Sequence, residues 1–239
     1  MCFLCPSPSV APSSPWSARR GFLLAAGSAA VAPALAQVEV GSASGMRRLV
    51  PAETLESSAT QQYSQLLAQA RAQGALVPSG HPQLARLHAI ARRLIPFTTP
   101  WNDRARHWRW EVNLIASKQI NAFCMPGGKI AFFTGILDQL RLTDDEAAMI
   151  MGHEMAHALR EHARERLAKT QATNLGLRLG AQLLGLGDVG QLAANLGGQL
   201  LTLKFSRGDE SEADLVGLEL AARAAFQPAA SVSLWQKMG

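Results

Sequence analysis

The chain has 239 residues, of which 48% are hydrophobic and 17% are charged. This length suits one domain, or one domain preceded by an export segment, and the composition excludes a disordered protein. The net charge of +5 falls to 21 − 18 = +3 when the two arginines of residues 1–36 are left out. No basic run carries interleaved aromatic residues, so a nucleic-acid-binding protein is excluded as well.

Residues 1–36 have the order of features found in a secretory signal peptide. Arg19 and Arg20 precede an uncharged apolar run that ends at Ala34–Ala36, a pattern typical of a small-residue cleavage site. The run has about 15 residues, too few for a transmembrane helix, although an uncleaved membrane anchor is the alternative. The paired arginines resemble a twin-arginine signal, but the usual lysine is missing, so the general secretory (Sec) route stays open. The sequence predicts an exported protein of the periplasm or cell envelope that begins at Gln37.

The cysteine content limits how the exported protein can be stabilised. Cys2 and Cys5 lie within the predicted signal peptide, which leaves Cys124 as the only cysteine of the exported form. No intramolecular disulfide can then form. The exported protein must be stabilised by its hydrophobic core, for which roughly 200 residues are sufficient.

The first elements expected after the signal are a linker and two helices. Residues 37–50 are rich in glycine and serine, a composition typical of linkers. A helical spacing of apolar residues follows over residues 51–73 and ends at Gly74. A second helix is predicted from Pro82 to Leu94, because proline is favoured in the first helical turn and further prolines follow the helix.

Two strands are predicted next along the chain. Residues 108–117 alternate apolar and polar side chains at their start, as a half-buried strand does. Residues 129–137 form the second predicted strand, and the sequence Pro126-Gly127-Gly128 between the two indicates a turn.

A long helix is predicted to begin after Thr143. Thr143 and Glu146 have the spacing of a capping box, and basic residues gather where the helix is expected to end, at Lys169. Residues 170–203 are rich in leucine and glycine, but their charged side chains disfavour a membrane span. We expect helices that pack beside the long helix. A flexible lid, or a hairpin that contacts a membrane surface through residues 175–203, is the alternative.

The long helix carries the pattern His-Glu-x-x-His. Residues four apart lie on one helix face, about 6 Å apart along the axis, so His153 and His157 can bind the same ion. Glu154 lies next to the first ligand, where it can reach a water molecule at the metal without binding the metal itself. The surrounding residues are apolar and indicate a buried helix, in which these three polar side chains would be costly without a cation. We therefore expect zinc, and not two core histidines bonded to backbone carbonyls.

A catalytic zinc site needs a third protein ligand. On a continuous helix His162 is turned about 140° away from the face of His157, which argues against it. Glu161 is on that face but about 12 Å along the axis from His153, too far for a metal bond. The metzincin class requires glycine where this chain has Arg160, so that class is excluded.

The third ligand is therefore expected from the helix predicted over residues 206–224, which precedes a last helix over 227–238. Glu210 and Asp214 are four apart and share one helix face. Glu210 can complete a His-His-Glu site, while Asp214 can accept a hydrogen bond from a ligand imidazole. Glu212 points about 160° away from that face and is expected to face the solvent.

Four stretches of the chain together resemble a known enzyme family. Their order and spacing are similar to those of the gluzincin zinc metallopeptidase family of HtpX and the CAAX prenyl endopeptidases, with most likeness to the periplasmic BepA/LoiP-like members. The stretches comprise residues 121–137, 142–162, 205–224 and 226–238. Before residue 80 the likeness is weak.

The resemblance implies an α+β fold over residues 51–239: a mainly helical, zincin-like domain with a small β-sheet beside the active-site helix. It implies one Zn²⁺ per chain on His153, His157 and Glu210, with Glu154 as the catalytic base. This domain is expected to lack the C-terminal extension usual in the family.

The resemblance also implies where a substrate binds. A peptide is expected to bind as an added strand along a sheet edge beside the cleft. The residues of this edge are Asn121, Ala122, Phe123, Pro126, Gly127 and Gly128. Cys124, within the same segment, is interpreted as a packing residue because relatives have a small or apolar residue there.

The predicted function is that of a zinc metalloendopeptidase. Its substrates are expected to be proteins or peptides, in particular misfolded or misassembled proteins of the cell envelope. The alternative is a zinc-bound, weakly proteolytic chaperone or assembly factor for envelope proteins.

Overall fold

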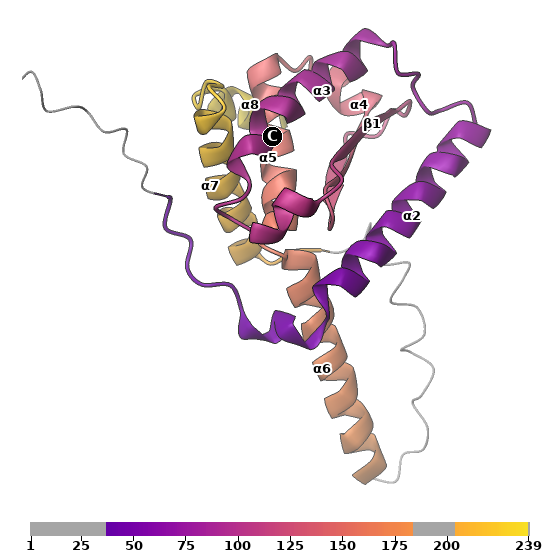
Figure 1. Ribbon diagram of the computed structural model, residues 1–239, viewed down its shortest axis with the longest axis vertical. Helices are drawn as coiled ribbons and strands as arrows, with labels where there is room; N and C mark the ends of the chain where they lie inside the picture. Colours follow the sequence, from indigo (N-terminus) through magenta and orange to yellow (C-terminus); the bar gives the residue numbers. More distant parts are fainter. Residues whose placement is uncertain (1–36, 184–203, 239) are drawn as a thin grey trace, which may run out of the picture. The chain divides into compact units, whose positions relative to one another are not determined.

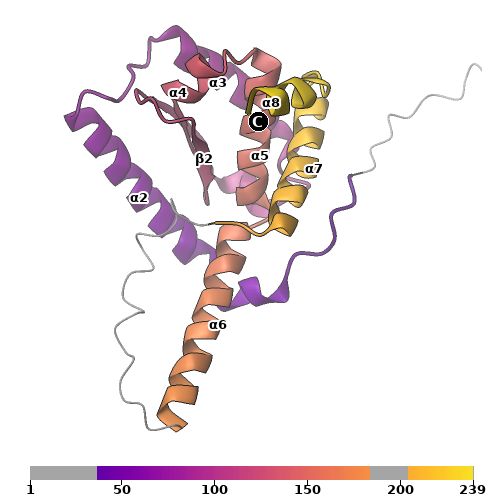
Figure 2. The same ribbon diagram turned by 180° about the vertical axis from the view of Figure 1, so that it is seen from behind.

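The computed structural model describes residues 37–183 and 204–238, drawn in colour in Figures 1 and 2. The signal peptide predicted for residues 1–36, and most of the stretch 175–203 with its predicted contact to a membrane surface, lie outside these residues. Among the described helices, none combines the length and the apolar character that a membrane span requires. The described residues from Val38 onwards belong to one compact unit.

A three-stranded mixed sheet forms one layer of this unit. Its strands are β1 (Glu111–Ile115), β2 (Ala122–Met125) and β3 (Lys129–Phe133), in the order β1-β3-β2. β3 pairs with β1 in parallel and with β2 in antiparallel orientation. The strand β2 is therefore an edge strand, and it was not among the predicted strands.

The turn before β3 explains how β2 forms. Gly127 and Gly128 have φ values of 83° and 76°, which favour glycine, and the Gly128 N–H donates to the Met125 carbonyl at 3.1 Å. This tight turn folds residues 122–125 back onto β3. The predicted strand over residues 129–137 was too long, because helix α4 (Thr134–Gln139) begins directly after Phe133.

Helices cover the two faces of the sheet. Helix α2 (Ala52–Ala72) packs on the face that contains Ala131, while α3 (Pro82–Leu94) and the later helices pack on the face that contains Ile130 and Phe132. Alternate residues of β3 thus enter different halves of the core, as the two-residue period of a strand requires. Figure 1 shows α2 on one side of the sheet and α5 on the other. The predictions for α2 and α3 are confirmed to within a residue or two.

Helix α5 (Asp144–Leu159) is the central helix of the unit. It begins with the predicted capping box, in which the Thr143 side chain accepts from the Glu146 N–H and the Glu146 carboxylate accepts from the Thr143 N–H. Its surroundings are α3, β2, α7 (Arg207–Arg223) and α8 (Ala230–Met238). Both views place α7 alongside α5 (Figures 1 and 2).

The predicted end of the long helix, at Lys169, was wrong. The helix stops at Leu159, Glu161 has a φ of 60°, and a separate helix α6 (His162–Leu183) then begins. The sequence here contains no glycine or proline, so the break depends on contacts made elsewhere in the fold. It changes the position of His162, as described below.

Short 3-10 helices complete the described part of the chain. They are η1 (Gly45–Leu49), η2 (Ile95–Phe97) and η3 (Asp103–His107). The stretch expected to be a linker contains η1 and makes contacts of its own. The Val38 N–H donates to the Glu219 carboxylate at 2.5 Å, and the Gly41 carbonyl accepts from Arg160 at 2.9 Å. A mainly helical α+β fold with one small sheet among the described residues confirms the predicted fold class.

Candidate metal centre

Helix α5 brings two imidazole rings together. The Nε2 atoms of His153 and His157 are 3.1 Å apart, and their rings are nearly perpendicular, at 73°. His157 is buried, whereas 23% of the His153 side chain is exposed. The predicted spacing of four residues on one helix face therefore places both rings at one point.

Helix α7 supplies a carboxylate at the same point. Glu210 Oε2 lies 3.4 Å from His153 Nε2, and Glu210 Oε1 lies 3.8 Å from His157 Nε2. One ligand atom from each of the three residues can be chosen so that all lie within 4.8 Å of one another. In a tetrahedral zinc site with bonds of ~2.0–2.1 Å, neighbouring ligand atoms are about 3.3 Å apart.

The chemistry of these three residues also fits zinc. The Nδ1 atom of each histidine has a partner on its other side, so both Nε2 lone pairs are directed toward the carboxylate. Three electron-rich atoms that face one another repel without a cation between them. Two imidazole nitrogens and a carboxylate oxygen are a ligand set of catalytic zinc sites, which keep a fourth position open.

A close approach of two glycines sets the distance between α5 and α7. A Cβ atom added to Gly217 would lie 2.5 Å from the His153 backbone nitrogen, and one added to Gly152 would lie 2.7 Å from the Gly217 carbonyl oxygen. No side chain fits at this crossing, so the backbones of the two helices are in contact. This contact brings Glu210 close to the two histidines.

Asp214, one turn after Glu210, lies behind His153. Its Oδ1 atom is 2.9 Å from His153 Nδ1, on the side of the ring opposite to His157. An ionised carboxylate only accepts hydrogen bonds, so it holds the proton on Nδ1 and leaves the Nε2 lone pair for a metal. The structure therefore places Asp214 where the sequence predicted it.

Asp214→Asn should weaken zinc binding by roughly 10–100-fold, the usual cost of removing a partner of a ligand histidine. The amide carries no charge and can present its NH₂ group to the ring, which no longer fixes the tautomer. Competition titration against a chelator measures the affinity. Asp103→Asn is a matched control, because Asp103 is exposed and its carboxylate pairs with Arg106 and not with a ligand histidine. Equal affinities of the two variants would contradict the assigned role.

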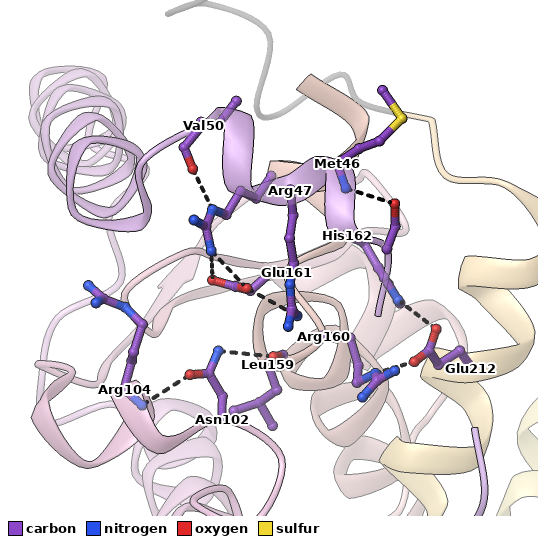
Figure 3. A network of polar contacts seen from close by, with 12 residues as sticks. Met46, Arg47, Val50, Asn102, Arg104, Leu159, Arg160, Glu161, His162 and Glu212 are labelled. Atoms are coloured by element: carbon purple, nitrogen blue, oxygen red, sulfur yellow. Dashed lines mark hydrogen bonds and ion pairs between the residues drawn. The ribbon is translucent and has the colours of Figure 1, made fainter. Parts of the chain in front are cut away.

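His162 is not among the three converging ligand residues, as predicted from the sequence, but the positions of His162 and Glu212 differ from those expected. His162 Nδ1 lies 2.9 Å from His157 Nδ1, because the helix break after Leu159 returns His162 to the ligand. A continuous helix, as assumed from the sequence, would have placed His162 on a different face from His157. Glu212 does not face the solvent: its carboxylate pairs with Arg160 and lies 3.3 Å from His162 Nε2, with 19% of the side chain exposed (Figure 3).

Glu154 lies between two cavities that meet at the candidate metal centre. One has a volume of about 220 Å³ and is bounded by β2 and Phe205. The other has a volume of about 420 Å³ and a mainly apolar wall, which includes Met149, Leu234 and Trp235. Burial, followed by the nearby Glu210 carboxylate, raises the pKa of Glu154 to about 8 in the metal-free protein. A bound divalent cation would oppose this rise.

The edge strand β2 forms a wall of the smaller cavity. Of the residues predicted for a substrate-binding edge, Asn121, Ala122, Phe123 and Pro126 line this cavity. Gly127 and Gly128 do not: they form the turn to β3, where an added Cβ atom would lie 3.7 Å from Glu56 and 2.8 Å from Trp110, respectively. The predicted edge is therefore shorter than the sequence indicated.

Cys124 lies on β2 among these residues and is buried. Burial raises the pKa of its thiol well above the usual range, so a reactive thiolate is disfavoured. This position confirms the interpretation of Cys124 as a packing residue.

Comparisons with known proteins agree with this geometry. The profile described as Peptidase family M48 matches residues 81–239. The mitochondrial metalloendopeptidase OMA1 of Schizosaccharomyces pombe is 35% identical over 164 residues, which cover 68% of this chain and 46% of that protein. Metalloprotease LoiP of Escherichia coli is 32% identical over 126 residues, or 51% of this chain and 48% of that protein.

A third relative, the beta-barrel assembly-enhancing protease of Yersinia pestis, is 30% identical over 136 residues, or 52% of this chain and 27% of that protein. The chain thus spans less than half the length of each of these three relatives. The matched profile covers well over half of this chain and includes the three residues of the candidate metal centre, Glu154 and the edge strand. The chain therefore belongs to Peptidase family M48, a family of zinc-dependent metalloendopeptidases.

Proposed function

We propose that this chain is a zinc-dependent endopeptidase that binds one zinc ion on His153, His157 and Glu210 and cleaves protein chains in an extended conformation. The observation that carries the proposal is the convergence of three ligand atoms beside an edge strand and two cavities. A peptide can pair with β2 as an added strand, as in other cases of strand addition to a sheet edge.

Glu154 is the general base in this proposal. When bound, zinc acts as a Lewis acid that polarises a carbonyl group and lowers the pKa of water. Glu154 accepts the proton from the attacking water and then delivers it to the nitrogen of the leaving amine. Glu154 lines both cavities, so its carboxylate can reach a peptide bond whose flanking residues occupy the two cavities.

The larger cavity indicates a preference in the substrate. Its walls are mainly apolar side chains from α5, α7 and α8, and it adjoins His153 and Glu154. Apolar pockets favour apolar ligands because burial removes their surface from water. We therefore propose that a large apolar side chain next to the cleaved bond occupies this cavity.

The proposed place of action is the periplasm or cell envelope, and the proposed substrates are misfolded or misassembled envelope proteins. Arg19, Arg20 and the apolar run after them support export. Similarity to a beta-barrel assembly-enhancing protease supports the substrate class. The similarity to mitochondrial OMA1 proteins supports neither of these two statements.

The purified protein should contain about one zinc ion per chain and lose it to a chelator. Since a ligand at 100 times its dissociation constant stabilises a protein by about 2.7 kcal/mol, zinc should raise the melting temperature by roughly 5–10 °C. Elemental analysis and thermal unfolding measure these effects. A protein purified without chelators that contains no metal, and that zinc does not stabilise, would contradict the assigned site.

Cleavage of an unfolded protein such as reduced casein tests the activity itself. Cleavage should stop with the chelator and return with zinc. Zinc binding together with suppression of aggregation, but without any cleavage, would instead favour the chaperone or assembly-factor alternative.

A further inference from the structure

The ring of His157 has a second buried imidazole behind it. Its Nδ1 atom lies 2.9 Å from His162 Nδ1, and the two rings are at 75° to each other. His162 is 2% exposed and His157 is 5% exposed, so water does not compete strongly for this contact. Phe205 stacks on the face of His157 at 4.2 Å between ring centroids. The face of the ring and its outer nitrogen are therefore both held.

We propose that His162 is a positioning residue of the metal centre, which holds His157 so that Nε2 faces His153 and Glu210. Glu212 in turn holds His162. This inference rests on the proposed zinc site and deepens it: it assigns a role to two residues that do not contact the metal.

The break between α5 and α6 has its own supports, which is why His162 reaches this position. Asn102 donates to the Leu159 carbonyl at 3.0 Å, where the helix ends. The Glu161 carboxylate, in the residue with positive φ, pairs with Arg47 at 3.2 Å and with Arg164 at 2.9 Å. Figure 3 shows Arg47, Asn102 and Glu161 around the break, with His162 directed toward Glu212.

The protons in this chain of contacts can be placed in only one way that leaves His157 free to bind a metal. Glu212 accepts, so His162 carries its proton on Nε2, and its Nδ1 is then an acceptor. His157 must therefore donate from Nδ1, which leaves the lone pair on Nε2. The contact thus selects the tautomer that a metal requires.

Arg160 completes the arrangement. Its guanidinium pairs with Glu212 and also donates to the Gly41 carbonyl, so its position is fixed from two sides. Arg160 balances the charge of Glu212, whose carboxylate also accepts from His162 Nε2. The Nδ1 atom of His157, both ring nitrogens of His162 and the Glu212 carboxylate then each have a partner of the correct kind.

Residues 210–214 of α7 would therefore supply one metal ligand and hold the other two in position. Glu210 is itself a ligand, Asp214 holds His153 directly, and Glu212 holds His157 through His162. The three acidic residues of this segment differ in role, although they are two residues apart in the sequence.

Replacing His162 tests the inference. His162→Phe keeps an aromatic ring but removes the acceptor, and zinc affinity should fall by roughly 10–100-fold. His162→Asn keeps an acceptor oxygen near the place of Nδ1 and should retain most of the affinity. His88→Phe is the matched control. His88 lies in α3, and one of its ring nitrogens likewise makes a contact of 2.9 Å, to the Val112 carbonyl oxygen. Affinity is measured by chelator competition, alongside melting of the metal-free variants.

A double-mutant cycle tests the role of Glu212. Glu212→Gln should weaken zinc binding in the wild-type background and have little further effect in the His162→Phe background, because Glu212 acts through His162. Wild-type affinity in His162→Phe would overturn the inference, and so would equal losses in His162→Phe and His162→Asn. A wild-type protein that binds no zinc would instead overturn the proposed function, so the two failures are distinguishable.

Discussion

Replacing Glu154 with glutamine should leave zinc bound and lower kcat by about 10²–10⁴-fold, the range attributed to a general acid–base group. The amide has nearly the same shape as the carboxylate but cannot accept the proton of the attacking water. His153, His157 and Glu210 are unchanged, so the ligand set is retained. Zinc content and the rate of casein cleavage, measured on the same preparation, check both halves of this expectation.

The metal-free Glu154→Gln variant offers a second readout. The folded-state pKa of Glu154 is raised from 4.5 to about 8, so between these values the folded state holds a proton that the unfolded state has released. The metal-free wild type should therefore lose stability as the pH rises through this window. The variant should not show this loss, because glutamine does not titrate. Cleavage at the wild-type rate, or an unchanged pH dependence of melting, would contradict the position assigned to Glu154.

Gly217→Ala should both destabilise the protein and weaken zinc binding by more than tenfold. The added Cβ atom would lie 2.5 Å from the His153 nitrogen, whereas real Cβ contacts essentially never fall below 3.0 Å, so α5 and α7 must separate by at least 3.0 − 2.5 = 0.5 Å. Metal–ligand distances tolerate only about 0.2 Å, so Glu210 moves out of reach. Overpacking of this kind costs roughly 1–3 kcal/mol, which lowers the melting temperature by about 2–12 °C.

Gly208→Ala is the matched control for this substitution. Gly208 also lies in α7, but an added Cβ atom would meet only Ser206 Oγ at 3.7 Å. This variant should bind zinc like the wild type and melt at the same or a slightly higher temperature, since alanine favours a helix. If Gly217→Ala bound zinc with unchanged affinity, the contact between the helices would not be what holds Glu210 at the site.

The metal-binding residues could be predicted because their signals are local. The spacing of His153 and His157 fixes their common face within any α-helix, and the same holds for Glu210 and Asp214. The sequence also indicated that these two helices, α5 and α7, lie together, because zinc needs a third ligand that α5 does not supply. Neither inference required knowledge of the path of the chain between α5 and α7.

His162 and Glu212 could not be placed from the sequence, because the helix break near them is a tertiary effect. Residues 159–162 contain no helix breaker, and the contacts that support the break come from Arg47 and Asn102, far away along the chain. The strand β2 was missed for a related reason. Its four residues are mostly apolar without alternation, so only pairing with β3 shows that they form a strand.

The contacts of Val38 and Gly41 have a consequence for the order of folding. Val38 bonds to a residue 181 positions later, and Gly41 bonds to Arg160, which is 119 positions later. Contacts that close such long loops carry a large entropic cost before they contribute, so they tend to form late. Arg160 also pairs with Glu212, which contacts His162 behind His157. The contacts that hold His157 are therefore complete only after residues 38–41 have packed against α5 and α7. We therefore expect hydrolytic competence to be acquired as one of the final events of folding, after most of the core has formed.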